Sequence, residues 1–188
     1  MKTDVLSRYD RVSMLIHWAT AALLIFMLVF GEELMEAGED AGEAGDALTG
    51  TFGPSLHVSI GALILALTLL RIIWRLAHPA PALPEGMKPY ERILSRSVHG
   101  LFYVLLIAIP VTGWLAFGGF VKEEPAMAAT RLFGALPMPL PPFTFSGAKD
   151  LHELGSNLAI ALIALHVLAA LKHQFIDRDG LIGRMLPY

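Results

Sequence analysis

Four long runs of apolar residues divide this chain, and polar connections separate them. The runs cover about 13–30, 55–76, 98–120 and 152–175. Each is close to the ~20 residues that an α-helix needs to cross the ~30 Å hydrocarbon layer of a bilayer. The pattern therefore predicts an all-α fold, a transmembrane four-helix bundle, as a single domain over residues 1–188.

The connections between the runs differ in composition. The first, 31–54, is rich in Gly, Ala and acidic residues and has no Lys or Arg, and the second, 78–97, contains four prolines, which interrupt a helix. In the third we expect a short surface helix at about 126–136, ahead of a proline-rich segment at 136–142.

Composition supports a membrane protein and removes several classes of site. The 188 residues are 55% hydrophobic and 16% charged, whereas about a quarter of the residues of a soluble domain are charged. The absence of cysteine excludes disulfides, iron–sulfur ligation and covalently attached haem, so any haem must be of the non-covalent b type.

No basic run interleaved with aromatics indicates nucleic-acid binding. Residues 1–11 are polar and the first apolar run contains His17, so we interpret that run as a span and not as a cleaved signal.

Basic residues are distributed unequally over the two sides of the predicted bundle. The termini and the second connection carry eleven of them: Lys2, Arg8, Arg11, Arg71, Arg75, Lys88, Arg92, Arg96, Lys172, Arg178 and Arg184. The other side has only Lys122, Arg131 and Lys149. By the positive-inside rule, both termini are cytoplasmic.

Two histidines occupy one stripe of the fourth run. His152 and His166 are fourteen positions apart, which is about 21 Å and just under four turns of an α-helix. Both imidazoles therefore leave the same face, one near each edge of the hydrocarbon layer. Histidine within a span is costly and usually functional, so we interpret this helix as supplying one axial ligand to each of two stacked haems.

Depth in the membrane suggests the partners of these two histidines. His57 lies at the level of His152, and His17 lies at the level of His166. Two histidine ligands leave iron no open position, which suits electron transfer. A zinc site would require three or four ligands at one depth, and such a set could be assembled only by including His99. In the alternative without any metal, the histidines are polar residues at helix ends. His99 itself could be a rival ligand, a partner of a haem propionate or part of a quinone site.

Other residues near the histidines have two interpretations each. Arg71 follows His57 by fourteen positions and could bind a haem propionate or extend towards lipid phosphate as a membrane anchor. Gly61, Gly155 and Ala159 could make room for a flat macrocycle, although small residues also mediate ordinary helix packing in membranes.

Motifs over nearly the whole chain resemble those of the bacterial cytochrome b561 family, four-helix membrane cytochromes with two haems. They are Arg8-Tyr9 with Leu15-Ile16-His17-Trp18, Leu56-His57-Val58, Arg71-Ile-Ile-Trp-Arg75, Val98-His99-Gly100, Ile109-Pro110-Val111-Thr112-Gly113, Phe133-Gly134 with Pro137-Met138-Pro139, the spacing of His152, His166 and His173, Arg178-Asp179-Gly180, and Arg184-Met185-Leu186-Pro187. Cytochrome b subunits of hydrogenases and formate dehydrogenases share this design, so the fold alone does not identify the partner.

The resemblance implies a location, ligands and an activity. It implies a bacterial inner-membrane protein with haem ligation by His17, His57, His152 and His166. It also implies an activity, because family members have been assigned superoxide:ubiquinone oxidoreductase activity, with superoxide oxidised at the outer face and ubiquinone reduced. His173 is then the candidate for the quinone pocket, with Lys172 or His99 assisting proton delivery, although His173 could equally be an interfacial cation at a helix end.

The first connection departs from the superoxide scheme. It carries seven acidic residues, namely Glu32, Glu33, Glu36, Glu39, Asp40, Glu43 and Asp46, whereas an anionic substrate is attracted by positive charge. Lys149, three residues before His152, is the candidate cation for superoxide, and Lys122 and Arg131 could join it in a local positive patch. The alternative is an electron-relay subunit whose acidic loop docks a cationic periplasmic redox protein such as a c-type cytochrome, and the loop could also be solvated without any docking role.

Overall fold

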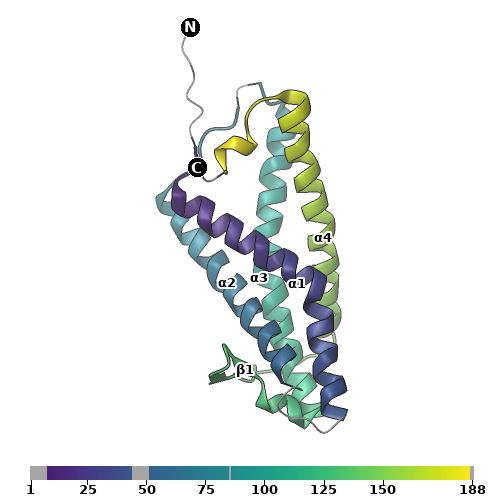
Figure 1. Cartoon of the computed structure of the whole chain (residues 1–188). Coiled ribbons are helices and arrows are strands. Elements are labelled where there is room, and N and C mark those ends of the chain that lie inside the picture. The colour runs from purple at the N-terminus through teal and green to yellow at the C-terminus, as the bar shows by residue number, and fades with distance from the viewer. Residues whose placement is uncertain (1–7, 44–50, 85, 187–188) are drawn as a thin grey trace.

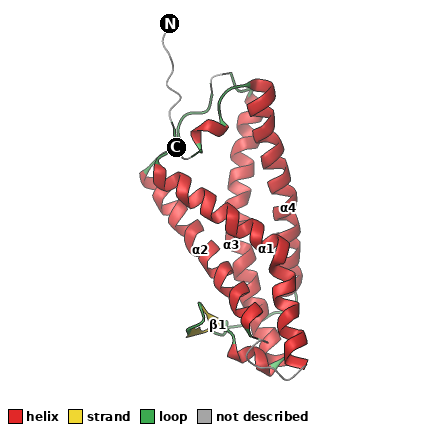
Figure 2. Cartoon of the chain, viewed as in Figure 1, coloured by secondary structure: helices red, strands yellow, loops and turns green. Residues whose placement is uncertain are grey.

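The computed structural model describes residues 8–43, 51–84 and 86–186. Four long helices dominate it (Figures 1 and 2): α1 Arg11–Glu43, α2 Phe52–Ala77, α3 Pro89–Glu123 and α4 Ala148–Lys172. Each is long and apolar enough to cross a membrane. The predicted transmembrane four-helix bundle is therefore confirmed.

Short elements occupy the two ends of the bundle. One end, which we call the hairpin end, carries the 3-10 helix η1 (Pro125–Ala129) and the two-stranded antiparallel hairpin β1 (Arg131–Leu132) and β2 (Leu136–Pro137). The other, the terminal end, carries the π-helical turn η2 (His173–Asp177) and the 3-10 turn η3 (Ile182–Arg184). Both described chain ends lie there, on the opposite side of the bundle from β1 (Figure 1).

The helices pack as two antiparallel pairs. The closest packing is α1 on α2 and α3 on α4, with weaker contact between α2 and α3. Figure 1 shows the two pairs converging towards the hairpin end and diverging towards the terminal end. A small apolar core of Val98, Leu105, Ala159 and Leu162 joins α3 to α4. Side chains from one face of each pair therefore point towards the other pair.

Apolar side chains cover the outside of the bundle. Leu15, Leu76 and Leu168 are 70%, 82% and 64% exposed, and no more than 22% of the most apolar window of any span is buried. In water such a surface would cost about 25 cal/mol per Å² of apolar area, whereas lipid solvates it without that cost. The exposure of these helices fits a bilayer as solvent.

Two helices are longer than the hydrophobic pattern predicts. α1 continues through Glu43 rather than ending near residue 30, so the acidic residues up to Glu43 lie on a helix and not in a loop. Asp46 lies outside the described residues. α3 begins at Pro89, nine residues before the predicted start, because proline is compatible with the first turn of a helix and the Glu91 carboxylate accepts the Lys88 N–H at 2.9 Å.

The predicted surface helix at 126–136 is wrong beyond its first turn. η1 ends at Ala129, and the chain then forms the hairpin, whose turn has positive φ at Phe133 (52°) and Gly134 (70°). Two successive left-handed residues suit a tight hairpin turn. The N–H groups of Arg131 and Phe133 donate to Ser55 Oγ and Ser59 Oγ of α2 at 3.0 and 2.7 Å. These tertiary hydrogen bonds replace the helical ones that the local sequence would allow.

The C-terminal segment folds back over the starts of α1 and α3. Trp18 Nε1 donates to the Met185 carbonyl at 2.7 Å, and Arg184 Nη1 donates to the Ala82 carbonyl at 2.6 Å. Asp10, just before α1, accepts hydrogen bonds from Ser13 and from Trp74 Nε1 of α2. Although burial alone would raise the pKa of Asp10, these hydrogen bonds hold it below its ordinary value. The terminal end is thus tied together by segments from both chain ends.

Candidate redox site

Four histidines meet as two pairs, and each of these pairs joins one helix pair to the other. The ring centres of His57 on α2 and His152 on α4 are 6.0 Å apart, and those of His17 on α1 and His166 on α4 are 6.5 Å apart. Metal–imidazole bonds of about 2 Å, with about 1 Å from nitrogen to ring centre, separate two axial imidazole centres by about 6 Å. Both pairs therefore have the separation of two ligands on opposite sides of one metal ion.

Hydrogen bonds fix the ring orientation of the pair near the hairpin end. His57 Nδ1 lies 2.9 Å from the Gly31 carbonyl oxygen, and His152 Nδ1 lies 2.7 Å from that of Ile109. A carbonyl oxygen only accepts, so each Nδ1 carries the proton and each Nε2 keeps its lone pair. Metal-bound histidines commonly donate their second N–H to a carbonyl in this way. The sequence did not reveal these two carbonyls, because backbone groups carry no sequence signal.

One glycine makes room for His152. A Cβ placed on Gly113 of α3 would lie 2.9 Å from both Cε1 and Nδ1 of the His152 ring, closer than real contacts permit. A Cβ on Gly31 would lie 3.5 Å from His57 Cε1, which is ordinary contact. Of the small residues noted above, Gly155 packs against Ile109 and Ala159 belongs to the α3–α4 core, so they serve helix packing. Gly61 has open space around its Cβ position.

A fifth histidine lies beside the pair near the terminal end. The ring centre of His99 on α3 is 5.6 Å from that of His166, and His99 Nδ1 donates to the Ser95 carbonyl at 2.6 Å. By distance alone His99 competes with His17. However, α3 and α4 pack directly on one another through a shared apolar core, whereas His17 approaches His166 from the other helix pair. This packing favours His17 as the partner of His166.

The predicted charged residues have different surroundings. Arg71 of α2 is half-buried, and its guanidinium lies within electrostatic range of the imidazoles of His17, His99 and His166. Lys149 is exposed at the start of α4, 3.8 Å from the Glu153 carboxylate, with its ammonium 5.8 Å from the centre of the Phe120 ring. Arg71 thus lies at the level of the His17–His166 pair, and Lys149 lies near the hairpin end with its charge partly balanced.

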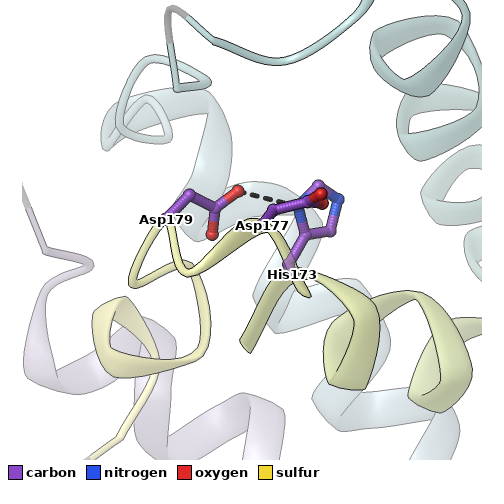
Figure 3. A group of neighbouring side chains, drawn as sticks. All are labelled: His173, Asp177 and Asp179. Atoms are coloured by element: carbon purple, nitrogen blue, oxygen red, sulfur yellow. Dashed lines mark hydrogen bonds and ion pairs between the residues drawn. The ribbon is translucent and has the colours of Figure 1, made fainter. Parts of the chain in front are cut away.

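His173 lies in a charged cluster at the end of α4 (Figure 3). Its Nδ1 is 2.7 Å from Asp179 Oδ2 and 3.1 Å from Asp177 Oδ2, and only 8% of the residue is exposed. Ligand atoms of the three residues lie within 4.8 Å of one another, a spacing that a metal ion could bridge. The Lys172 ammonium, however, is paired with the same Asp177 oxygen and with Glu91 Oε1 of α3 at 2.8 Å, and a cation at that oxygen disfavours a second one.

The sequence did not indicate that Asp177, Asp179 and Glu91 surround His173. Asp179 belongs to the Arg178-Asp179-Gly180 motif, but six residues from His173 it would point elsewhere on a regular helix. The π-helical turn and the left-handed Arg178 (φ 53°) bring it back. Lys172, suggested above for proton delivery, is ion-paired with Glu91 and Asp177.

A transmembrane four-helix bundle with histidine pairs between its helices defines the class of membrane b-type cytochromes. The chain belongs to the prokaryotic cytochrome b561 family, which it matches over residues 8–188. This membership implies electron transfer and b-type haem binding, and it confirms the resemblance seen in the sequence.

Three relatives illustrate the family. Cytochrome b561 homolog 2 of Escherichia coli (strain K12) is 31% identical over 98% of this chain and 94% of its own length. Cytochrome b562 of Cereibacter sphaeroides is 31% identical over 95% of this chain and 94% of its own length. Probable superoxide oxidase CybB of Yersinia pestis is 30% identical over 70% of this chain and 73% of its own length.

Proposed function

We propose that this cytochrome binds two b-type haems, one between His57 and His152 and one between His17 and His166, and moves electrons across the bacterial inner membrane. When bound, each haem supplies one-electron exchange at an iron with no open coordination position. The observation that carries the proposal is the pair of ring separations, 6.0 and 6.5 Å, between ligands from opposite helix pairs.

The residues around these ligands fit such a group. The carbonyls of Gly31 and Ile109 fix Nδ1–H and leave Nε2 for the metal. The half-buried Arg71 supplies a guanidinium at the level of the His17–His166 pair, where it would bind a carboxylate such as a haem propionate. His99 would then be a neighbour of the site and not a ligand.

Charge orients the bundle in the membrane, and the name of one relative supports a direction of electron transfer. The positive-inside rule puts the basic terminal end in the cytoplasm and the hairpin end outside. At the outer end, two superoxide ions would each lose one electron and leave as dioxygen. At the inner end, ubiquinone would take up those two electrons and two protons and become ubiquinol, with His173 at the quinone. The name of the Yersinia pestis relative, probable superoxide oxidase, favours superoxide as the donor.

A second candidate is electron relay from a cationic periplasmic protein to the quinone pool. The pairing of Lys149 with Glu153 reduces the positive charge available to an anion near His152, and the outer part of α1 carries Glu32, Glu33 and Glu36. Such acidic surfaces raise the association rate of cationic partners. The two candidates share the haems and the quinone and differ only in the donor.

Two measurements test the proposal. The purified protein should contain two haems per chain by pyridine haemochrome, and alanine at His57 or His152 should remove one of them while alanine at His17 or His166 removes the other. A superoxide pulse in a stopped-flow instrument should reduce the haems faster than superoxide dismutates, with ubiquinol as product. A protein without a Soret band would contradict haem binding altogether.

The donor is decided separately. If superoxide does not reduce the haems and a reduced basic c-type cytochrome does, at a rate that falls with added salt, the relay function replaces the oxidase function. The salt dependence is expected because screening shortens the range of surface charges to about 8 Å at physiological ionic strength.

A further inference from the structure

The carboxylate of Asp179 is fixed by two hydrogen bonds. Its Oδ1 accepts the Leu181 N–H at 3.0 Å, and its Oδ2 lies 2.7 Å from His173 Nδ1. The Asp179 N–H in turn donates to the His173 carbonyl at 3.3 Å. In Figure 3 the Asp179 carboxylate points at the imidazole from the segment that follows the π-helical turn. The buried His173 imidazole and the partly exposed Asp179 carboxylate therefore form a hydrogen-bonded pair of defined geometry.

Ion pairs tie this pair to the neighbouring helix. Lys172 links Asp177 beside His173 to Glu91 on the first turn of α3. The charged groups that face His173 are thus Asp177 and Asp179 from its own segment, and Glu91 with Lys172 between the helices. This arrangement holds the imidazole at the terminal end, one to two turns past His166 along α4.

An acceptor at Nδ1 determines which nitrogen exchanges protons. Because a carboxylate accepts and does not donate, Nδ1 keeps its proton and Nε2 is the atom that gains or loses one. A hydrogen-bonded carboxylate is the usual means of setting the tautomer and direction of a histidine that transfers protons. The Nε2 edge of His173 is consequently set for proton exchange.

We propose that Asp179 is a positioning residue that holds His173 as the Nδ1–H tautomer and so directs Nε2 to a quinone oxygen. The proposal rests on quinone reduction at this end of the bundle. Two electrons come from the proposed haems; for each proton, the Nε2–H bond of protonated His173 breaks and an O–H bond forms on the quinone. Nε2 then regains a proton from the aqueous side. In the reverse direction, Nε2 accepts a proton from the quinol.

The test replaces Asp179 by asparagine. Asp179→Asn keeps Oδ1 as the acceptor for the Leu181 N–H, so the loop retains its hydrogen bond. The new side-chain amide, however, presents an N–H donor to His173 Nδ1, and Nδ1 can accept it only with a lone pair, that is, without its proton. The imidazole should switch to the Nε2–H tautomer, because the other nearby acceptor, Asp177 Oδ2 at 3.1 Å from Nδ1, is already paired with the Lys172 ammonium. Asp150→Asn, which removes an exposed carboxylate from the first turn of α4, is the matched control.

Two readouts are needed. Reduction of the haems by decylubiquinol should slow at least about tenfold at saturating quinol, with the half-saturating concentration and haem content unchanged, and Asp179→Glu should recover part of the rate. In ¹⁵N-histidine NMR of the dithionite-reduced protein, which is diamagnetic with two histidine ligands per iron, the His173 signals should report Nδ1–H in wild type and Nε2–H in Asp179→Asn. Unchanged kinetics or an unchanged tautomer in Asp179→Asn would overturn the proposal.

His173→Gln separates this proposal from the proposed function. If His173→Gln slows the quinol reaction and Asp179→Asn does not, the quinone site stands and the positioning role is wrong. If His173→Gln reacts with quinol as wild type does, the quinone is bound elsewhere and both statements about this site are wrong. If Asp179→Asn loses haem, Asp179→Glu is the deciding variant. If Asp179→Glu has the wild-type His173 tautomer and recovers part of the quinol rate, the positioning role is supported. If it has the wild-type tautomer and the rate does not recover, the role is contradicted.

Discussion

Gly113→Ala should loosen one haem and leave the other in place. The added Cβ would lie 2.9 Å from Cε1 and Nδ1 of His152, whereas ordinary contact begins near 3.4 Å. The imidazole or the helix must therefore move by about 0.5 Å. The hydrogen bond from His152 Nδ1 to the Ile109 carbonyl, now 2.7 Å, is the contact that this movement stretches first.

The expected loss can be stated in energy. Overpacking a well-packed site costs about 1–3 kcal/mol, and disturbing a hydrogen bond behind a metal ligand typically lowers metal affinity about 10–100-fold. A tenfold change corresponds to about 1.4 kcal/mol, so the two considerations agree. We expect about 10–100-fold weaker haem binding at the His57–His152 site.

Gly31→Ala is the matched control. It adds the same methyl group beside the partner ligand, but at 3.5 Å from His57 Cε1 the group makes an ordinary contact, and alanine is the better helix former by roughly 0.5–1 kcal/mol. Pyridine haemochrome on purified protein should give two haems per chain for Gly31→Ala and fewer for Gly113→Ala. Optical redox titration should show loss of the component that His57→Ala also lacks. Equal haem content and identical titrations for the two alanine variants would refute the reasoning.

Three further predictions concern charge and ligand choice. Arg71→Leu should lower the midpoint potential of the His17–His166 haem, because a nearby positive charge favours the reduced state. A loss of about 1 kcal/mol of this electrostatic stabilisation corresponds to about 40 mV for one electron. An unchanged midpoint in a spectroelectrochemical titration would contradict this prediction. His99→Asn should retain two haems by pyridine haemochrome, and loss of one would make His99 a ligand. Lys149→Glu should slow reduction by a superoxide pulse severalfold at low salt and less at high salt, without changing either midpoint; an unaltered rate would remove Lys149 from the donor site.

The hydrophobic pattern was sufficient to predict the four spans but not their ends. Each span must carry about 20 apolar residues, and that requirement is visible in any single sequence. The extension of α1 to Glu43 was missed because its last turns are polar, and helix-forming Glu and Ala residues continue the helix without an apolar signal. The hairpin was missed because Ser55 and Ser59, more than seventy residues away, supply its hydrogen bonds.

Part of the candidate site could be predicted from the sequence. A stripe of two histidines on one helix, with others at matching depths, predicts which residues can meet, because helical periodicity converts sequence spacing into height. The choice between His17 and His99 beside His166 could not be made in this way, since both lie at the same height. It depends on which helices pack directly on one another and on which helix pair each histidine belongs to.

By itself, the sequence determined the number of spans, the absence of cysteine chemistry and the heights of the histidines, because hydrophobicity and helical rise are local properties. The tertiary structure decided what surrounds those histidines. Gly113 against His152, the Gly31 and Ile109 carbonyls behind the ligands, and Asp179 against His173 all join residues on different segments or across a π-helical turn. Such contacts depend on how the helices pack and where the backbone departs from regular geometry, and neither is encoded in the spacing of residues along one chain.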